Sequence, residues 1–316
     1  VYAGIKSYMS GMESTAKVFY TNSNLQDLEV VGKNFTNEDL DEIKKIEHVK
    51  NAERRLTLNA TMECDEDRTL NLNFIESNDI SKFYVVDGIE FSKDKKGVWL
   101  DEYYAKKNNL SVGDSIKIKY ENKTFEEEIL GLINVPDHVY DIKDESALFP
   151  THIDYGFCYM SIDEFPVSIV KSQLMDKMHI DSEEIFDKLM PDFNINDYIV
   201  YNYVLVDVDT EENKTIVKNQ IEDSVENALA VTDIKDGASY SAYQGEIEEG
   251  ETYVGVFTGL FLLIAILSVI TTMTRIVKKQ RVQIGTLKAL GFSNKKVVLH
   301  YVGYGFFISL ISAILG

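Results

Sequence analysis

Histidine and carboxylate side chains gather in one short stretch of this 316-residue chain and are its first candidates for chemistry. Asp137, His138, Asp141 and His152 lie within sixteen residues of one another. Imidazole and carboxylate groups are common ligands of zinc, but the ligands of such sites usually show tighter spacing on one face. A polar surface loop has the same composition. The stretch therefore favours a surface loop over a metal site.

Other residue patterns that carry chemistry are missing from the sequence. It contains no GxxxxGK[S/T] loop for nucleotide phosphates and no HExxH, CxxC or GxSxG motif. Two groups of acids, Glu126 to Glu128 and Glu246 with Glu248 and Glu249, are typical of solvated faces rather than of acid–base catalysis. We therefore predict no enzymatic activity, no cofactor and no metal for this chain.

The charges are divided sharply along the chain. Residues 253–316 contain no Asp or Glu and hold seven Lys and Arg, all between two apolar runs, 253–274 and 297–316. The first run has 22 uncharged residues, and as a helix it would be about 33 Å long, enough to cross a bilayer. Short loops rich in Lys and Arg stay in the cytoplasm. We therefore predict a multi-pass protein of the cell membrane, with 1–252 outside and 275–296 in the cytoplasm.

The part predicted to lie outside is strongly acidic. It holds all 52 Asp and Glu with 25 of the 32 Lys and Arg, a net charge of −27. Phosphate binding needs a basic face, so this charge excludes nucleic acid as a partner. An acidic shell that keeps the domain hydrated explains the charge, and a cationic ligand or peptide is the alternative. Two cysteines, Cys64 and Cys158, are too few for a disulfide framework, which favours free thiols.

The sequence begins without Met and ends inside an apolar run. We therefore expect a segment upstream of Val1, most simply a first transmembrane helix, to carry residues 1–252 outside. The run at 297–316 is then the start of a further transmembrane helix.

Two β-α-β patterns lie far apart in the acidic part. The first has a strand at 28–33, a helix near 34–47 begun by Thr36 and Asp39, and a strand at 49–62. The second comprises a strand at 201–209, a helix at 211–229 and a strand at 230–234. Two such units can pair into one ferredoxin-like subdomain. Residues 1–69 and 166–252 would supply its halves, with a helical connection at 166–200.

The segment between these halves, residues 70–165, has a different pattern. Short apolar strands recur at small spacing and are separated by turn residues such as Asp87-Gly88 and Gly113-Asp114. This pattern predicts a small β-rich insert. The predicted fold class is thus an α+β domain, made of a split ferredoxin-like, porter-like subdomain and a β-rich insert, followed by transmembrane helices.

The basic segment between the two apolar runs predicts a short amphipathic helix. Ile284, Leu287 and Leu290 recur every three residues and form one apolar stripe. Gly291 suits the left-handed position that ends a helix, and Ser293 suits the N-cap of the next one. The stripe can lie in the lipid headgroups with its basic residues on anionic lipid. It can equally enter a groove on a cytoplasmic protein.

The stretch QRVQIGTLKALGFSNKKVVLHY, residues 280–301, resembles the signature of the FtsX-like permease family. These are the transmembrane subunits of MacB/LolC-type ABC transporters. Residues 34–53, 110–118 and 131–140 resemble the ectodomain of that family, most closely in the long permeases of Gram-positive bacteria. In many relatives a Glu stands at the position of Gln283.

The resemblance implies a coupling helix that docks on a separate cytoplasmic ATPase. Its contact residues would be Gln283, Ile284, Gly285, Leu287, Lys288, Leu290 and Gly291. It also implies a second permease copy or a paralogue as partner, and motion passed to the external domain for export or extraction of a lipid, lipoprotein, peptide or antibiotic. A regulator that activates a cell-wall hydrolase and a membrane-anchored sensor or adhesin are the competing functions.

Overall fold

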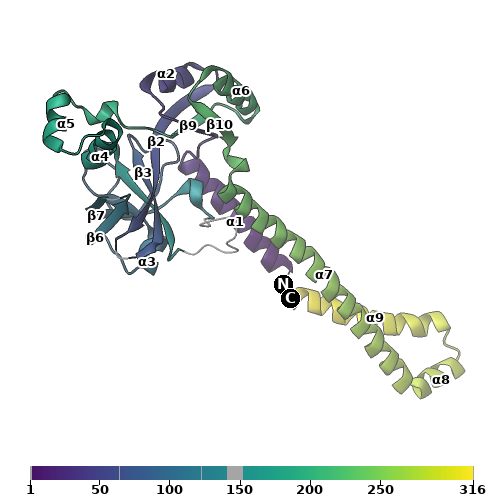
Figure 1. Cartoon of the computed structure of the whole chain (residues 1–316). Helices are drawn as coiled ribbons and strands as arrows, with labels where there is room; N and C mark the ends of the chain where they lie inside the picture. Colours follow the sequence, from purple (N-terminus) through teal and green to yellow (C-terminus); the bar gives the residue numbers. More distant parts are fainter. Residues whose placement is uncertain (1, 64, 122, 141–151, 316) are drawn as a thin grey trace. The chain divides into compact units, whose positions relative to one another are not determined.

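The computed structural model (Figure 1) describes residues 2–63, 65–121, 123–140 and 152–315. They form two units, which we call the α+β unit (residues 15–244) and the helical unit (residues up to 14 together with 245 onward). The predicted fold class is confirmed, because an α+β domain is followed by a long apolar helix.

The two predicted β-α-β patterns form four adjacent strands at one end of the ten-stranded sheet of the α+β unit. Its elements are β1 (Leu28–Gly32), α2 (Asn37–Lys45), β2 (Val49–Met62), β9 (Tyr203–Val208), α6 (Lys214–Ser224) and β10 (Ala228–Asp233). All three pairings are antiparallel, in the order β10-β1-β9-β2. This is the order of a ferredoxin-like β-α-β-β-α-β fold, so the predicted split arrangement is confirmed.

Helices α2 and α6 lie together on one side of this sheet (Figure 1). The side chains of Ile43 on α2 and Ile221 on α6 are fully buried in the same core as Val30 of β1. The start of α2 is fixed by the predicted capping box: the Thr36 N–H donates to Asp39 Oδ2 at 2.7 Å, and the Asp39 N–H donates to Thr36 Oγ1 at 3.2 Å. Local sequence and core packing therefore agree on this helix.

The predicted β-rich segment closes into a ring that includes β2. The remaining strands are β3 (Asp65–Ile75), β4 (Tyr84–Gly88), β5 (Val98–Asp101), β6 (Ser115–Tyr120), β7 (Lys123–Asn134) and β8 (Tyr155–Ser161). Pairing runs β2-β3-β8-β5-β7-β6, and β6 returns to β2 where Thr61 and Met62 face Lys119 and Ile118. Strand β4 pairs with β7. Strand β2 therefore belongs to both the ferredoxin-like sheet and the ring.

Short helices complete the α+β unit. They are α3 (Glu102–Lys107), η1 (Pro136–His138), η2 (Ile162–Glu164), α4 (Val167–Met178), α5 (Glu183–Leu189), η3 (Ile195–Asp197), η4 (Glu211–Asn213) and η5 (Ile234–Asp236). Helices α4 and α5 form the predicted helical connection between the ring and β9. Helix α3 begins directly at the end of β5, where the Asp101 side chain caps it.

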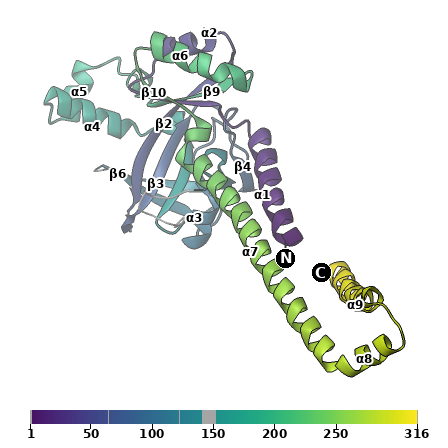
Figure 2. The same ribbon diagram turned by 90° about the vertical axis from the view of Figure 1, so that its right-hand side faces the viewer.

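The helical unit is built on the part of α7 (Ala238–Lys279) from residue 245 onward. It also holds the part of α1 (Tyr2–Asn22) up to residue 14, with α8 (Arg281–Ala289) and α9 (Asn294–Leu315). Helices α1 and α7 run side by side (Figure 2), and Met9 packs against Gly250. A Cβ at Gly250 would lie 2.5 Å from the Met9 sulfur, so glycine permits this close approach. Among the described helices, α7 is the one that is long and apolar enough to cross a membrane.

Helix α7 is much longer than the apolar run from which it was predicted. Its 42 residues begin fifteen positions before Tyr253 and continue to Lys279. At 1.5 Å per residue this is about 63 Å of unbroken helix, roughly twice the hydrocarbon thickness of a bilayer.

Candidate functional site

The predicted amphipathic helix is present as α8, directly after α7. Residue Gln280 joins the two helices: its N–H donates to Ile276 O at 2.9 Å, and its carbonyl accepts from the Ile284 N–H at 3.0 Å. Ile284 is half-buried, whereas Leu287 and Leu290 expose 37% and 71% of their surface. The apolar stripe thus has two uncovered leucines in the described part of the chain, and single uncovered residues of this kind can anchor a partner.

Gly291 ends α8 with the left-handed conformation that the sequence predicted. Its φ is +89°, a value that side chains with a Cβ rarely adopt. The Gly291 N–H donates to Lys288 O at 3.0 Å, and the Phe292 N–H donates to Leu287 O at 3.1 Å. This pair of bonds is a Schellman motif, which satisfies the last carbonyls of the helix.

The next helix, α9, begins at the predicted N-cap. The Lys296 N–H lies 3.5 Å from Ser293 Oγ and 3.0 Å from the Ser293 carbonyl. The hydroxyl of Tyr301 on α9 donates to Gln280 Oε1 at 2.6 Å, which ties α9 to the junction of α7 and α8. A cavity of about 550 Å³ lies beside this bond, and Gln283 lines it. Both ends of α8 are therefore held by local hydrogen bonds.

The described members of the histidine and carboxylate cluster do not form a metal site. Asp137 pairs with Arg55, His138 stacks on Phe157 with ring centroids 4.0 Å apart, and His152 stacks on Tyr103. Asp141 lies outside the described residues. Across the described parts of the chain, no group of three or more His, Cys, Asp or Glu side chains is placed to hold a metal ion.

The cysteines and the acidic group at 246–249, both noted in the sequence, do not form reactive sites among the described residues. Cys158 is a free thiol buried in the core, and burial raises its pKa, while Cys64 lies outside the described residues. Glu246, Glu248 and Glu249 are exposed on α7, as expected for a solvated face.

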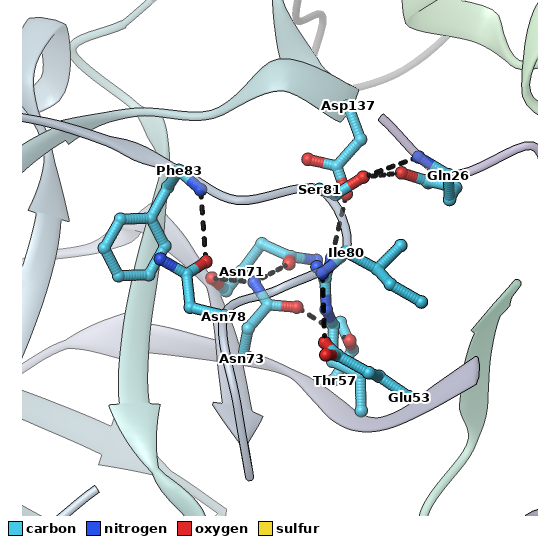
Figure 3. A network of polar contacts seen from close by, with 11 residues as sticks. Gln26, Glu53, Thr57, Asn71, Asn73, Asn78, Ile80, Ser81, Phe83 and Asp137 are labelled. Carbon is cyan, nitrogen blue, oxygen red and sulfur yellow. Dashed lines mark hydrogen bonds and ion pairs between the residues drawn. The ribbon is translucent and has the colours of Figure 1, made fainter. Parts of the chain in front are cut away.

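A buried polar network was missed by the sequence analysis (Figure 3). Its ion pair joins Arg55 on β2 to Asp137 on η1, with 2.9 Å between Nη1 and Oδ2. The side chains are only 7% and 3% exposed. Burial opposes ionisation of Asp137, but the adjacent His138 and Arg55 outweigh it and hold the pKa of that carboxyl below its usual value. Two consecutive arginines inside an alternating strand were the signal in the sequence, since a buried charge requires a partner.

The same network fixes the loop after β3 against the chain that follows α1 (Figure 3). The Ser81 hydroxyl donates to the Gln26 side-chain oxygen, and the Gln26 N–H donates to Ser81 Oγ at 3.1 Å. On the other side, Thr57 donates to Asn73 Oδ1 at 2.8 Å. Polar groups of β2, β3 and η1, and of the segments before β1 and after β3, are thereby joined in the interior.

The pKa of the Asp101 carboxyl is raised well above its usual value. Asp101 is 9% exposed and caps α3, accepting from the Tyr104 N–H at 2.6 Å. Burial raises its pKa from 3.8 to about 6, and the hydrogen bond from Tyr104 opposes this only in part. The folded protein therefore keeps a proton on Asp101 over a range of pH in which the unfolded chain has lost it.

We expect Asp101→Asn to change how stability depends on pH. As pH rises from about 4 to about 6, wild type loses up to ~3 kcal/mol of unfolding free energy through this group, whereas the variant has no such group. Asparagine is also an N-cap residue, so α3 should persist. Guanidinium unfolding followed by the fluorescence of Trp99, which is fully buried, measures this at pH 4 and 7. An equal difference between variant and wild type at both values would contradict the expectation.

Comparison with known proteins gives one family match and two structural likenesses. Residues 255–316 match the model of the FtsX-like permease C-terminal family. The extracellular domain of the noncanonical ABC-type transporter YknZ from Gram-positive bacteria is 15% identical, with a TM-score of 0.36 over 63% of this chain and 89% of that one. The periplasmic region of MacB from Actinobacillus actinomycetemcomitans is 10% identical, with a TM-score of 0.36 over 66% and 89%. No curated protein sequence matches.

The family match covers most of the apolar half of α7, all of α8 and α9. It contains the stretch whose signature suggested the same family, and all seven residues predicted to form the coupling helix. The resemblance stated from the sequence is therefore confirmed. Residues 255–316 of this chain are thus similar to the C-terminal part of FtsX-like permeases.

Proposed function

We propose that this chain is the transmembrane permease subunit of an ABC transporter, working with a separate cytoplasmic ATPase. The observation that carries the proposal is the family match over residues 255–316. Such subunits do not hydrolyse ATP themselves, which agrees with the lack of a phosphate-binding loop in the sequence. The protein would be multi-pass, with 275–296 in the cytoplasm, 297–316 in the membrane and 1–252 outside.

In this proposal α8 is the contact with the ATPase. Leu287 and Leu290 are exposed beside the half-buried Ile284, which is the arrangement that a helix needs to enter a groove on another protein. The Schellman motif and the Ser293 cap hold the helix in a fixed register between α7 and α9. Gln283, Gly285, Lys288 and Gly291 would complete the contact.

Helix α7 would carry the motion outward. It is continuous over 42 residues, so a displacement near Lys279 can be transmitted along the hydrogen-bonded backbone to Ala238. The external part, with proposed subdomains at 1–69, 70–165 and 166–252, would use this motion on a lipid, lipoprotein, peptide or antibiotic. A second permease copy or a paralogue, with lipid around the spans, would complete the assembly.

We expect Leu287→Glu to abolish copurification of the ATPase with the full-length protein in mild detergent. A carboxylate at this position would have to be desolvated in an apolar groove, which costs several kcal/mol and outweighs the contribution of one contact. The matched control is Ala289→Glu, which adds the same charge to an exposed position of α8 away from the stripe. Wild type and the control should retain an ATPase. Equal retention by all three would exclude the stripe as the docking face, and no ATPase with wild type would refute the proposed function.

A further inference from the structure

A pocket in the α+β unit is lined mainly by aromatic rings. It has a volume of about 530 Å³, within the range of small-molecule sites. The rings come from α1, β4, α3, η1, β8 and the turn before β8: Phe19, Tyr84, Tyr103, His138, His152, Tyr155 and Phe157. The pocket is separate from α8 and belongs to a different unit of the chain.

The rings around the pocket contact one another, and two of the tyrosines also remain largely exposed. His138 stacks on Phe157 at 4.0 Å between centroids, and Tyr155 meets the same phenylalanine edge-on at 5.4 Å. Tyr103 stacks on His152 at 5.1 Å. Tyr84 and Tyr103 nevertheless expose 61% and 51% of their surface. Aromatic faces around a cavity attract cations, most strongly when the cation is withdrawn from water.

The charges of the pocket favour the same kind of ligand. Among the described lining residues, Asp101 is the one carboxylate. Burial lowers the pKa of His138, against an opposing effect of Asp137, and burial with nearby Lys107 lowers the pKa of His152. Both imidazoles are therefore neutral at pH 7 and above. A ligand there meets one negative charge and no competing cation on the lining.

An unused acceptor lies in the same wall. The side-chain oxygen of Asn134, at the end of β7, is buried and has no hydrogen-bond partner among the described residues. A buried acceptor left unpaired costs about 1–3 kcal/mol, so a donor from a ligand would recover part of that cost. Protonated amines are donors and accept nothing, which matches a wall with a carboxylate and a free amide oxygen.

We propose that this pocket binds a cationic ligand, an amine or ammonium group carried on an apolar body. The aromatic rings would hold the apolar body and the face of the cation, while Asp101 and Asn134 would meet the charge. The strong net negative charge of residues 1–252 would raise the local concentration of cations and speed their arrival. This inference concerns binding alone and does not depend on an ATPase.

The test compares two probes of nearly equal shape by calorimetry, using the full-length protein in detergent. Phenethylamine is protonated at about pH 8, and 2-phenylethanol is its neutral counterpart. We expect the ammonium to bind at least about tenfold more tightly than the alcohol. Asp101→Asn should remove most of that preference. Tyr84→Ser, at a largely exposed position, should also weaken binding of the ammonium.

Two variants outside the pocket serve as matched controls. Asp94→Asn removes an exposed carboxylate, and Tyr8→Ser removes a tyrosine that is 63% exposed on α1. Both should bind the ammonium as wild type does. The proposal would be overturned if the ammonium did not bind, or if it bound no more tightly than the alcohol. It would also be overturned if the two controls lost binding, or if Asp101→Asn and Tyr84→Ser bound the ammonium as wild type does.

Discussion

Replacing Arg55 with methionine is expected to lower the unfolding free energy by about 3–5 kcal/mol at pH 7, because it leaves Asp137 buried without its cation. The lost bond is the 2.9 Å pair between two side chains that are 7% and 3% exposed. Glu29 adds to the cost, since burial and Asp137 already raise its pKa while Arg55 opposes that rise. Guanidinium unfolding followed by Trp99 fluorescence measures the change.

A second variant separates the ion pair from simple packing. Arg55→Met combined with Asp137→Leu removes both charges, and we expect it to recover most of the lost stability. Lys188→Met is the exposed control: it breaks the 2.8 Å pair with Glu184, in which both side chains are largely exposed, and should change stability little. If the double variant were as unstable as Arg55→Met, the unpaired carboxylate would not be the cause.

If the chain has the proposed function, Gly245→Pro is expected to uncouple the external domain from nucleotide binding by the ATPase. Proline removes one backbone donor in α7 and clashes with the carbonyl four residues earlier, at a cost of about 3 kcal/mol or more. Position 245 is well inside the helix, and a Cβ there meets nothing within 4 Å, so the backbone effect is isolated. Hydrogen exchange over residues 15–244, with and without ATP in the assembled complex, measures the coupling.

Gly245→Ala is the matched control for this break. It adds a Cβ at the same position and should strengthen the helix by up to about 1 kcal/mol. We expect wild type and the alanine variant to show an ATP-dependent change in exchange, and the proline variant to retain the ATPase without that change. An undiminished change in the proline variant would refute transmission through α7.

Local signals in the sequence predicted the individual elements well. Thr36 and Asp39 marked the start of α2 correctly, and alternation gave the bounds of β2 exactly as the structure has them. Gly291 and Ser293 bounded the connection between α8 and α9. These features depend on residues within about one helical turn or on a period of two, which one sequence contains in full.

Contacts between distant segments could not be predicted in this way. The return of β6 to β2 rests on two residue pairs, and nothing in either strand specifies the other. Arg55 and Asp137 are 82 positions apart, so their pairing is visible only once β2 and η1 are placed. The extension of α7 back to Ala238 was missed because its polar first turns lack an apolar stripe.

The candidate sites differ in the same respect. Helix α8 was predicted because its residues are consecutive and match a family signature, whereas the aromatic pocket draws on seven elements between Phe19 and Phe157. His138 and His152 were noticed in the sequence as metal candidates. In the structure each imidazole stacks on an aromatic ring instead: His138 on Phe157 and His152 on Tyr103. These stacked pairs line the pocket.

The position of β1 has a consequence for how the chain folds as it is made. Strand β1 ends at Gly32, but its two neighbours begin only at Tyr203 and Ala228. The hairpins β2-β3 and β6-β7 can close soon after they emerge, while β1 keeps both edges open until nearly the whole domain has appeared. An open, valine-rich edge is a template for mispairing with other chains. Because the subdomain is split, the strand that is synthesised first is the last to gain its neighbours in the sheet.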